Sequence, residues 1–315
     1  MIVRWGLAEL HGVLGDLGVD RPLLVASERW TKTDLPVRPA ARWSEVPSER
    51  IADAVAQAGD GVLALGGGSA IDLAKAISAE AGVPVVSIPT TYAGAEWTAY
   101  FGIRDPQRKM KGGGGGAHLG GVVYEPELTL SLPREETVGT ALNALAHCAE
   151  ALYVQGHNPE ADEHALTGAR LIGEWLPRVV DAPRDLDGRT KLLEGAMHGG
   201  MALGGSMLGL GHAMAQALGG RYGLPHGAMN ALCLPAALRF NSELAPDAIR
   251  RFHEALGSSV EALARLGGFE RLRDSGVPED ELDEVAEAAA RRAGNQANPR
   301  PATPAEIESL LRSIW

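Results

Sequence analysis

Two kinds of hydrophobic pattern divide the chain. Up to about residue 130, short apolar runs alternate with segments whose apolar residues recur every three or four positions. We therefore expect strands at 21–27, 61–65, 83–88 and 122–124, and helices at 7–17, 49–59 and 70–81. Near-continuous apolar strands joined by helices are typical of a parallel sheet covered on both faces. Residues 104–121 break this pattern with a glycine run, Gly112 to Gly116, and we expect a flexible loop there.

From Arg134 onward the pattern is helical almost throughout. We expect helices at 134–155, 159–175, 188–203, 207–218, 228–241, 246–267, 278–293 and 303–314. The change of periodicity places a domain boundary near Pro133. The predicted architecture is an α/β domain over residues 1–133, followed by an all-helical domain over residues 134–315.

Composition narrows the function. With 45% apolar residues and a net charge of −11, the chain has the make-up of a globular enzyme, not of a disordered or fibrous protein. Its acidity argues against nucleic acid as the main partner, because phosphate contacts need clustered Lys and Arg. Two cysteines, Cys148 and Cys233, are too few for a disulfide framework. No apolar run approaches the ~20 residues that span a bilayer, and the N-terminus does not have the features of a signal peptide. We expect a cytoplasmic protein without a membrane partner.

A glycine-rich corner is the first candidate site. The strand at 61–65 runs into Gly66-Gly67-Gly68-Ser69 and then into a helix that carries Asp72 and Lys75. Glycines let the backbone approach a phosphate closely, and the N–H groups at a helix start hold the anion. A glycine triplet also serves as an ordinary tight turn, but ligands bind open α/β sheets at the carboxyl ends of strands. The next strand leads into Thr90 and Thr91, whose hydroxyls can bond phosphate or ribose, or cap a helix.

Three histidines are the strongest candidates for chemistry. His147 follows Asn143 by four positions in a predicted helix, so both side chains share one face. His212 opens another helical run, and His226 lies in a segment that we expect to be a turn. Two helices and one turn can bring three imidazoles and an amide oxygen to one point. That ligand set suits a divalent metal with positions left open for substrate.

Four motifs, in order along the chain, resemble those of the iron-containing alcohol dehydrogenase superfamily. They are Gly66-Gly67-Gly68-Ser69-x-x-Asp72-x-x-Lys75, Pro89-Thr90-Thr91, Asn143-Ala-Leu-Ala-His147, and His212 followed by Pro225-His226-Gly227. Residues 91–98, 143–153 and 297–301 are most similar to maleylacetate reductases. The resemblance implies the dehydroquinate synthase-like fold: an N-terminal Rossmann-like domain, an all-α C-terminal domain, and an active site in the cleft between them.

The resemblance also implies a nicotinamide cofactor, NADH or NADPH. It assigns Gly67, Gly68, Ser69 and Asp72 to the pyrophosphate and nicotinamide region, and Thr90, Thr91 and Tyr92 to phosphate and ribose. One of Lys109 or Lys111 is expected to match a family lysine that reaches the cofactor. Ser27 stands where many relatives carry an Asp that would repel a 2′-phosphate, and Arg29 is nearby, so use of NADPH stays open; Ser27 can equally be an ordinary strand-end residue.

Three residues depart from the family pattern. Metal-dependent alcohol dehydrogenases have Asp at the position of Asn143, and a neutral amide lowers the affinity for iron or zinc. If a metal binds, the resemblance makes Asn143, His147, His212 and His226 its ligands. Maleylacetate reductases share this Asn, which implies that their histidines act as hydrogen-bond and acid–base groups. Gln216 replaces a His of the proton relay, and Asn230 matches the alcohol dehydrogenases, whereas the reductases tend to have His.

The function expected from this resemblance is reduction of maleylacetate to 3-oxoadipate, a step in the degradation of aromatic compounds, by NADH or NADPH. His147, His212 and His226 would be the catalytic residues, and the substrate would be a small carbonyl or enoate compound that bears carboxylates. Arg104, Arg221 and Arg239 are candidates to hold a carboxylate. The alternative is a metal-dependent alcohol dehydrogenase or aldehyde reductase, and the loss of His at Gln216 keeps an inert nucleotide-binding homologue open. A homodimer is expected, with the apolar segment around Ile2, Val3 and Trp5 pairing across a two-fold axis.

Overall fold

The computed structural model describes residues 1–105 and 110–315, which fall into two compact units. The first unit holds residues 1–91, 95–103 and 112–131, and the second holds the rest of the described chain, chiefly 132–315. Lys109 lies outside the described residues, as do the side chains of Arg104 and Lys111. None of the helices in the described part of the chain combines the length and apolar character that a membrane crossing requires.

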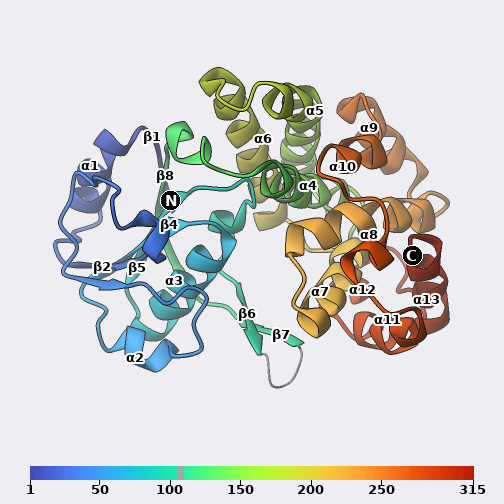
Figure 1. Ribbon diagram of the computed structural model, residues 1–315, viewed down its shortest axis with the longest axis horizontal. Coiled ribbons are helices and arrows are strands. Elements are labelled where there is room, and N and C mark those ends of the chain that lie inside the picture. The colour runs from blue at the N-terminus through green and yellow to red at the C-terminus, as the bar shows by residue number, and fades with distance from the viewer. Residues whose placement is uncertain (106–109) are drawn as a thin grey trace. The chain divides into compact units, whose positions relative to one another are not determined.

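A six-stranded sheet forms the centre of the first unit (Figure 1). Its strands lie in the order β1 (Ile2–Trp5), β8 (His118–Tyr124), β5 (Pro84–Pro89), β4 (Gly61–Gly66), β2 (Pro22–Val25) and β3 (Ala41–Trp43). Every neighbouring pair is parallel. The predicted parallel α/β architecture is therefore confirmed.

The apolar side chains of the central strands alternate between two cores. Leu63 and Leu65 pack on one face of the sheet with the residues of α1 (Leu10–Asp16). Val62 and Ala64 pack on the other face, against α3 (Gly68–Ala81) and α2 (Ile51–Val55). Because successive strand residues point to opposite faces, a strand covered on both sides must be apolar at every position.

One local prediction in this half of the chain is wrong, and two short strands were not predicted. The expected loop at 104–121 contains strands in its described part: β6 (Phe101–Asp105) pairs with β7 (Met110–Gly114), and β8 already begins at His118. Glycines in β7 hid the strand, because glycine is depleted in strands. Gly113 and Gly114 are needed there, since an added Cβ would lie 2.5 Å from the Phe101 carbonyl oxygen or 2.7 Å from its ring. The sequence also did not reveal the short strands β1 and β3.

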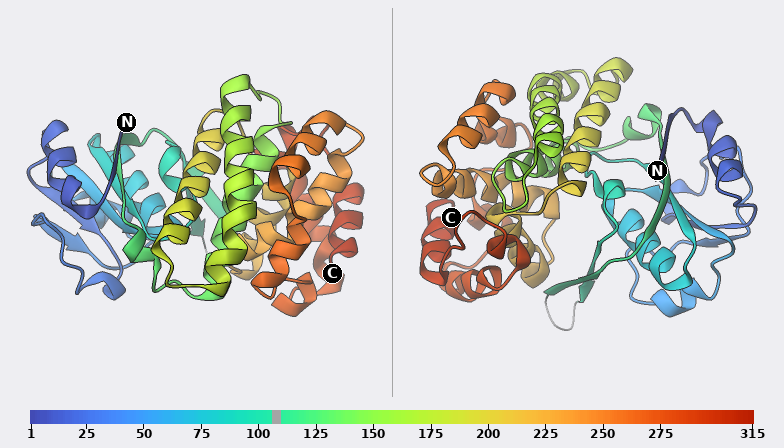
Figure 2. Two further views of the ribbon diagram at one scale, coloured as in Figure 1. Left: turned by 90° about the horizontal axis from the view of Figure 1, so that it is seen from above. Right: turned by 180° about the vertical axis from the view of Figure 1, so that it is seen from behind.

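The second unit is helical. Its α-helices are α4 (Arg134–Ala151), α5 (Pro159–Asp181), α6 (Leu186–Gly204), α7 (Leu210–Tyr222), α8 (His226–Asn241), α9 (Pro246–Leu256), α10 (Val260–Leu266), α11 (Leu282–Ala290), α12 (Ala293–Gln296) and α13 (Pro304–Ser313). Helices α5 and α6, coloured yellow-green, run side by side in both views of Figure 2. The confirmed fold is thus an α/β unit with a parallel sheet, followed by a helical unit.

Helix boundaries differ from the prediction in three places. The helix expected at 246–267 is two helices, because Gly257 adopts φ 63° and Ser259 caps the start of α10. The helix expected at 278–293 is divided into a 3₁₀ turn at Glu279–Glu281, α11, and the start of α12. His226 does not lie in a turn, since it is the first residue of α8 behind Pro225. Three helices, not two helices and a turn, therefore carry the histidines.

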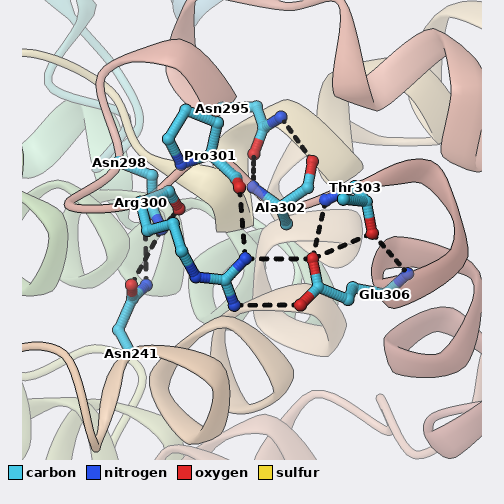
Figure 3. Close-up of polar contacts among 8 residues, drawn as sticks. All are labelled: Asn241, Asn295, Asn298, Arg300, Pro301, Ala302, Thr303 and Glu306. Atoms are coloured by element: carbon cyan, nitrogen blue, oxygen red, sulfur yellow. Dashed lines mark hydrogen bonds and ion pairs between the residues drawn. The ribbon is translucent and has the colours of Figure 1, made fainter.

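Side-chain amides and a capping box fix the segment Ala297–Pro301, which resembles maleylacetate reductases (Figure 3). Asn298 and Asn241 exchange two hydrogen bonds, of 2.8 and 3.0 Å, although both are fully buried. Arg300 forms an ion pair with Glu306, which also completes the capping box of α13 with Thr303. The segment is thus a structural clasp in the helical unit.

Candidate functional site

The glycine corner of the first unit has the local geometry expected for an anion site. Strand β4 ends at Gly66, and α3 begins two residues later with Gly68 and Ser69, whose N–H groups have no acceptor within the helix. A Cβ on Gly67 would lie 2.8 Å from the Cγ2 atom of Thr91, so only glycine fits between the two turns. The Thr90 N–H donates to the Gly66 carbonyl at 3.1 Å, which joins the ends of β4 and β5.

Asp72 and Lys75 are tied to the chain around them. The Lys75 ammonium, 1% exposed, forms an ion pair with Asp72 at 2.9 Å and donates to the carbonyl oxygens of Ala95 and Tyr100. The Asp72 carboxylate also accepts from the Gly102 N–H at 3.1 Å. This lysine therefore anchors the segment that follows β5, and the structure places Asp72 one helical turn from the glycine corner.

Tyr92 lies apart from the glycine corner in the division of the chain, since residues 92–94 belong to the helical unit. Its ring is fully buried, and its hydroxyl accepts from the Arg189 guanidinium at 3.0 Å. Its backbone N–H donates to the Thr140 hydroxyl at 3.2 Å. The phenol of Tyr92 is thus engaged within the helical unit, whereas Thr90 and Thr91 lie beside the glycines.

The end of β2 carries cations that bear on the choice of cofactor. Ser27 follows the strand, and Arg42 of β3 donates to its carbonyl oxygen at 2.8 Å. Arg29 donates to Ser131 and lies over the Trp30 ring. Sequence reasoning missed Arg42, because β3 was not predicted and its register beside β2 was unknown.

In the helical unit, the three histidines come together as the sequence suggested. The ring centroids of His147 on α4 and His212 on α7 are 4.8 Å apart, and the rings are nearly parallel at 14°. His226 on α8 lies 5.7 Å from His212. His147 and His212 are buried, at 5% and 1% exposure. The low local dielectric constant strengthens the hydrogen bonds of their ring nitrogens.

Glu150 is a residue of the candidate site that sequence reasoning missed. Its carboxylate is fully buried and lies 2.6 Å from Nδ1 of His212. It also accepts from the backbone N–H groups of Gly209 and His212, at 2.7 and 3.0 Å, and so caps the start of α7. A Cβ on Gly211 would come within 2.9 Å of this carboxylate, which explains the glycine. A signal was present, because residues 143, 147 and 150 have the i, i+4, i+7 spacing of one helix face.

A chain of amide contacts connects Asn143, Asn230 and His226. The Asn143 amide nitrogen donates to the Ala93 carbonyl at 2.9 Å, which directs its oxygen toward Asn230. The Asn230 amide nitrogen then donates to that oxygen at 2.6 Å and lies 3.1 Å from Nε2 of His226. An amide NH₂ cannot accept, so His226 Nε2 is the acceptor in this contact. Asn230, which was noted only as a departure from the family, therefore organises two of the candidate ligands.

These contacts decide how well the side chains fit a divalent metal. Imidazole nitrogens and an amide oxygen are suitable donors, and Nε2 of His212 is buried without a hydrogen-bond partner. However, Asn143 contributes no charge. In this structure the Asn143 oxygen and the His226 Nε2 atom are both hydrogen-bonded to Asn230.

Two of the three arginines considered for a substrate carboxylate, Arg221 and Arg239, have acidic partners. Arg221 forms ion pairs with Glu281 and Glu284 at 2.7 and 2.8 Å, and Arg239 lies 3.7 Å from Glu261. Gln216, one turn after His212, accepts from Arg292 at 3.2 Å. Arg292 was not a candidate in the sequence, because nothing in its local pattern connects it with α7.

Comparison with protein families matches both parts of the chain. Residues 4–119 match the model of iron-containing alcohol dehydrogenases, and residues 137–315 match the model of the C-terminal part of the Fe-containing alcohol dehydrogenase family. The chain is 38% identical to a maleylacetate reductase of Burkholderia cepacia over 262 residues, which is 81% of this chain and 74% of that protein. It is 35% identical to maleylacetate reductase 1 of Cupriavidus pinatubonensis, covering 95% of this chain and 89% of the relative.

Solved structures give the same result. The crystal structure of a maleylacetate reductase from Agrobacterium tumefaciens is similar with a TM-score of 0.89 and 31% identity, covering 100% of this chain and 95% of that one. An iron-containing alcohol dehydrogenase from Corynebacterium glutamicum has a TM-score of 0.88 and 32% identity, covering 100% of this chain and 94% of the other. The similarity therefore extends over both units.

Proposed function

Because the chain belongs to the iron-containing alcohol dehydrogenase family, we propose that it is an NAD(P)H-dependent reductase of the maleylacetate reductase type. Its substrate is then a small enoate that bears carboxylates, and its product from maleylacetate is 3-oxoadipate. The observation that carries this proposal is the convergence of His147, His212 and His226 in a unit where Glu150 orients the central ring.

The two functional parts are residues 1–133 for the dinucleotide and residues 134–315 for the substrate. Gly67, Gly68 and Ser69 bind the pyrophosphate through the start of α3, beside Thr90 and Thr91. Asp72 and Tyr92 complete the set proposed for the cofactor. The dinucleotide supplies the hydride when it is bound. Cations at Arg29 and Arg42 near Ser27 are compatible with NADPH as well as NADH.

In the proposed reaction, a hydride adds to the carbon–carbon double bond conjugated with the ketone. The electron pair of that bond moves toward the ketone oxygen, which becomes an enolate. Imidazole N–H groups stabilise the developing negative charge, and a proton then adds to the α-carbon to give the saturated ketone. NAD(P)H and one proton are consumed for each molecule reduced.

His212 is the best-positioned of the three rings for this work. The Glu150 carboxylate lies against its Nδ1, so this nitrogen carries a hydrogen, and Nε2 has an N–H to donate to the enolate oxygen only when the ring also holds a second proton. A carboxylate in this position holds the tautomer and offsets positive charge on the ring, as the Asp of a catalytic triad does. His147 stacks on His212, and His226 lies next to it.

The test is oxidation of NADH and of NADPH, followed by the absorbance of the reduced nicotinamide, with maleylacetate and with a panel of aldehydes. We expect turnover of maleylacetate that a chelator does not abolish. Turnover of aldehydes alone, lost with chelator and restored by iron or zinc, would instead establish a metal-dependent alcohol dehydrogenase. The buried Nε2 of His212 is the observation that keeps this second function in view.

We also propose a homodimer. Strand β1 is the last strand of the sheet and pairs with β8 along one edge. Met1 and Trp5 beside that edge are 49% and 37% exposed, so large apolar side chains adjoin a strand edge that is open to pairing. A monomeric mass in light scattering would contradict this proposal.

A further inference from the structure

Arg292 is a partly buried cation of the helical unit without an acidic partner. It precedes α12, which packs against α7. Among the described residues, no carboxylate lies within 4.0 Å of its guanidinium, and its Nε atom is buried without a hydrogen-bond partner. The cost of removing a cation from water is normally offset by an anion. Its absence here points to an anion that comes from outside the chain.

Arg189, Arg221 and Arg251 of this unit either have a carboxylate partner or are completely enclosed by neutral acceptors. Arg221 has two carboxylates, and Arg251 has Asp162 at 2.9 Å. Arg189 is 1% exposed and is surrounded by the hydroxyls of Tyr92 and Thr137 and a carbonyl oxygen, so it has no surface left for a ligand. Burial lowers the pKa of Arg292 from its usual range, which is the expected result for a cation that lacks a counter-ion.

Gln216 holds the Arg292 guanidinium in place. Its side-chain oxygen accepts from Nη1 at 3.2 Å, and its backbone oxygen accepts from Nη2 at 3.3 Å. Both acceptors are neutral, so they orient the guanidinium without cancelling its charge. Gln216 follows His212 by four residues on α7, which places the two side chains on one helix face about 6 Å apart along the axis.

We infer that Arg292 binds a carboxylate of the substrate and that Gln216 is the residue that positions it. The inference rests on the proposed function, because it names the group that recognises the carboxylate-bearing class of substrate. A ketone oxygen at the histidines and a carboxylate a few bonds away would span the distance between His212 and Arg292. The inference also gives a reason for Gln216 in place of the histidine of the family pattern. The glutamine oxygen accepts from the guanidinium and orients it, whereas a protonated histidine ring could not accept that hydrogen bond.

The test compares Arg292→Gln with Arg291→Gln, its neighbour in sequence. Arg291 is exposed, and its one ion pair among the described residues is with Glu287, one turn earlier on α11, so the control removes the same charge at almost the same place. For each protein, kcat and KM are measured with maleylacetate and with an uncharged enone or aldehyde. A hydrogen-bonded ion pair contributes about 1.5–3 kcal/mol, so Arg292→Gln should lower the preference for the carboxylated acceptor by roughly 10–100-fold, mainly through KM.

Further variants separate binding from folding. Arg292→Lys should recover part of the preference, because lysine keeps the charge but loses the two-pronged donor geometry. A general loss of structure would lower activity with both acceptors equally. That result, or an effect of Arg291→Gln as large as that of Arg292→Gln, would overturn the inference.

Direct binding distinguishes the inference from the proposed function. Adipate, a dicarboxylate of the same chain length as the proposed product, serves as the probe in calorimetry with the cofactor present. We expect adipate to bind the parent protein and Arg291→Gln, and to bind Arg292→Gln at least ~10-fold more weakly. If no acceptor is reduced but adipate binding depends on Arg292, the proposed reaction is wrong and the anion site stands. If maleylacetate is reduced but neither binding nor KM depends on Arg292, the anion site is wrong and the reaction stands.

Discussion

The glycine corner and the histidine cluster are built from different parts of the polypeptide. At the glycine corner, backbone N–H groups are the binding groups, and the absence of side chains on the glycines leaves space for a ligand. All of these residues lie within one strand, one turn and one helix. The histidine cluster consists of side chains from α4, α7 and α8. Neighbouring residues such as Glu150 and Asn230 hold hydrogen bonds that orient these side chains. The first kind of site depends on local backbone shape, whereas the second depends on tertiary packing.

The largest expected effect comes from the rings themselves. Replacing His147 or His226 by Ala should reduce turnover of maleylacetate by ~10²-fold or more, because each removes a hydrogen-bond or acid–base group from the reacting centre. Steady-state kinetics with saturating cofactor measure this change. The matched control is His253→Ala, since His253 lies in the last turn of α9 and is exposed. Unchanged turnover in both cluster variants would remove these rings from the mechanism.

A backbone site should instead be sensitive to a single methyl group. Gly67→Ala places a Cβ 2.8 Å from Thr91, and relief of that contact must shift one of the two turns that form the corner. Overpacking costs about 1–3 kcal/mol, so the Kd for NADH or NADPH should rise roughly 10–100-fold. Fluorescence titration of the reduced cofactor measures the Kd.

The control for this variant is Gly12→Ala in α1, where an added Cβ has nothing within 4 Å. Gly12→Ala should leave the Kd unchanged and, by helix propensity, raise stability slightly. Equal cofactor binding by Gly67→Ala and the parent protein would show that the corner does not carry the pyrophosphate.

The same contrast explains what the sequence could predict. The parallel sheet, the glycine corner and the helical second half follow from periodicity and from contiguous motifs. The grouping of the histidines was predicted from ring type and helix spacing together with family resemblance. Glu150, Asn230 and Arg292 acquire their roles only through partners 62, 87 and 76 residues away in the chain. A strand such as β7 was missed because its glycines are required by close packing on Phe101, which no local pattern reveals.

A third prediction concerns the affinity of the histidine cluster for a divalent metal ion, a property that the glycine corner does not share. In Asn143→Asp, one carboxylate oxygen can accept from Asn230, and the added charge offsets that of the ion. The other oxygen replaces the amide nitrogen that donated to the Ala93 carbonyl, so it must turn away from that carbonyl oxygen and toward the cation. We expect this variant to bind Zn²⁺ or Fe²⁺ ~10–100-fold more tightly than the parent protein, in line with the effect of residues that orient ligands. Elemental analysis after desalting measures the bound metal without reference to activity.

Two further variants decide where that ion binds. His147→Ala in the Asn143→Asp background should remove the gained affinity. Asn158→Asp adds the same charge at the start of α5, where the side chain caps the helix, and should not change metal content. A parent protein that already retains one ion per chain would show that the amide contacts of Asn230 do not exclude a metal.

The smallest expected effect is on stability and comes from Glu306, which belongs to a local capping motif inside the helical unit. The ion pair with Arg300 and the bonds from Thr303 lower the pKa of Glu306 from 4.5 to about 2. Because the folded pKa is depressed, the stabilisation is present above about pH 4.5 and is lost as the pH falls toward 2. The side chain is 37% exposed, so solvent screening reduces the contribution of this pair.

Glu306→Gln should therefore lower the free energy of unfolding by about 0.5–1 kcal/mol at pH 7, because the ion pair with Arg300 is lost while the glutamine oxygen can still complete the capping box, and by less at pH 3. Urea unfolding at both pH values measures the difference. Glu308→Gln on the same helix removes an ordinary pair with Arg312, and should cost only about 0.3–0.5 kcal/mol. Because Thr303 and Glu306 form a box within four residues, their effect should not depend on any change at the histidines. If Glu306→Gln lost as much turnover as His147→Ala, the contacts around Glu306 would have to influence the histidine cluster. The local motif and the histidine cluster would then not be independent of each other.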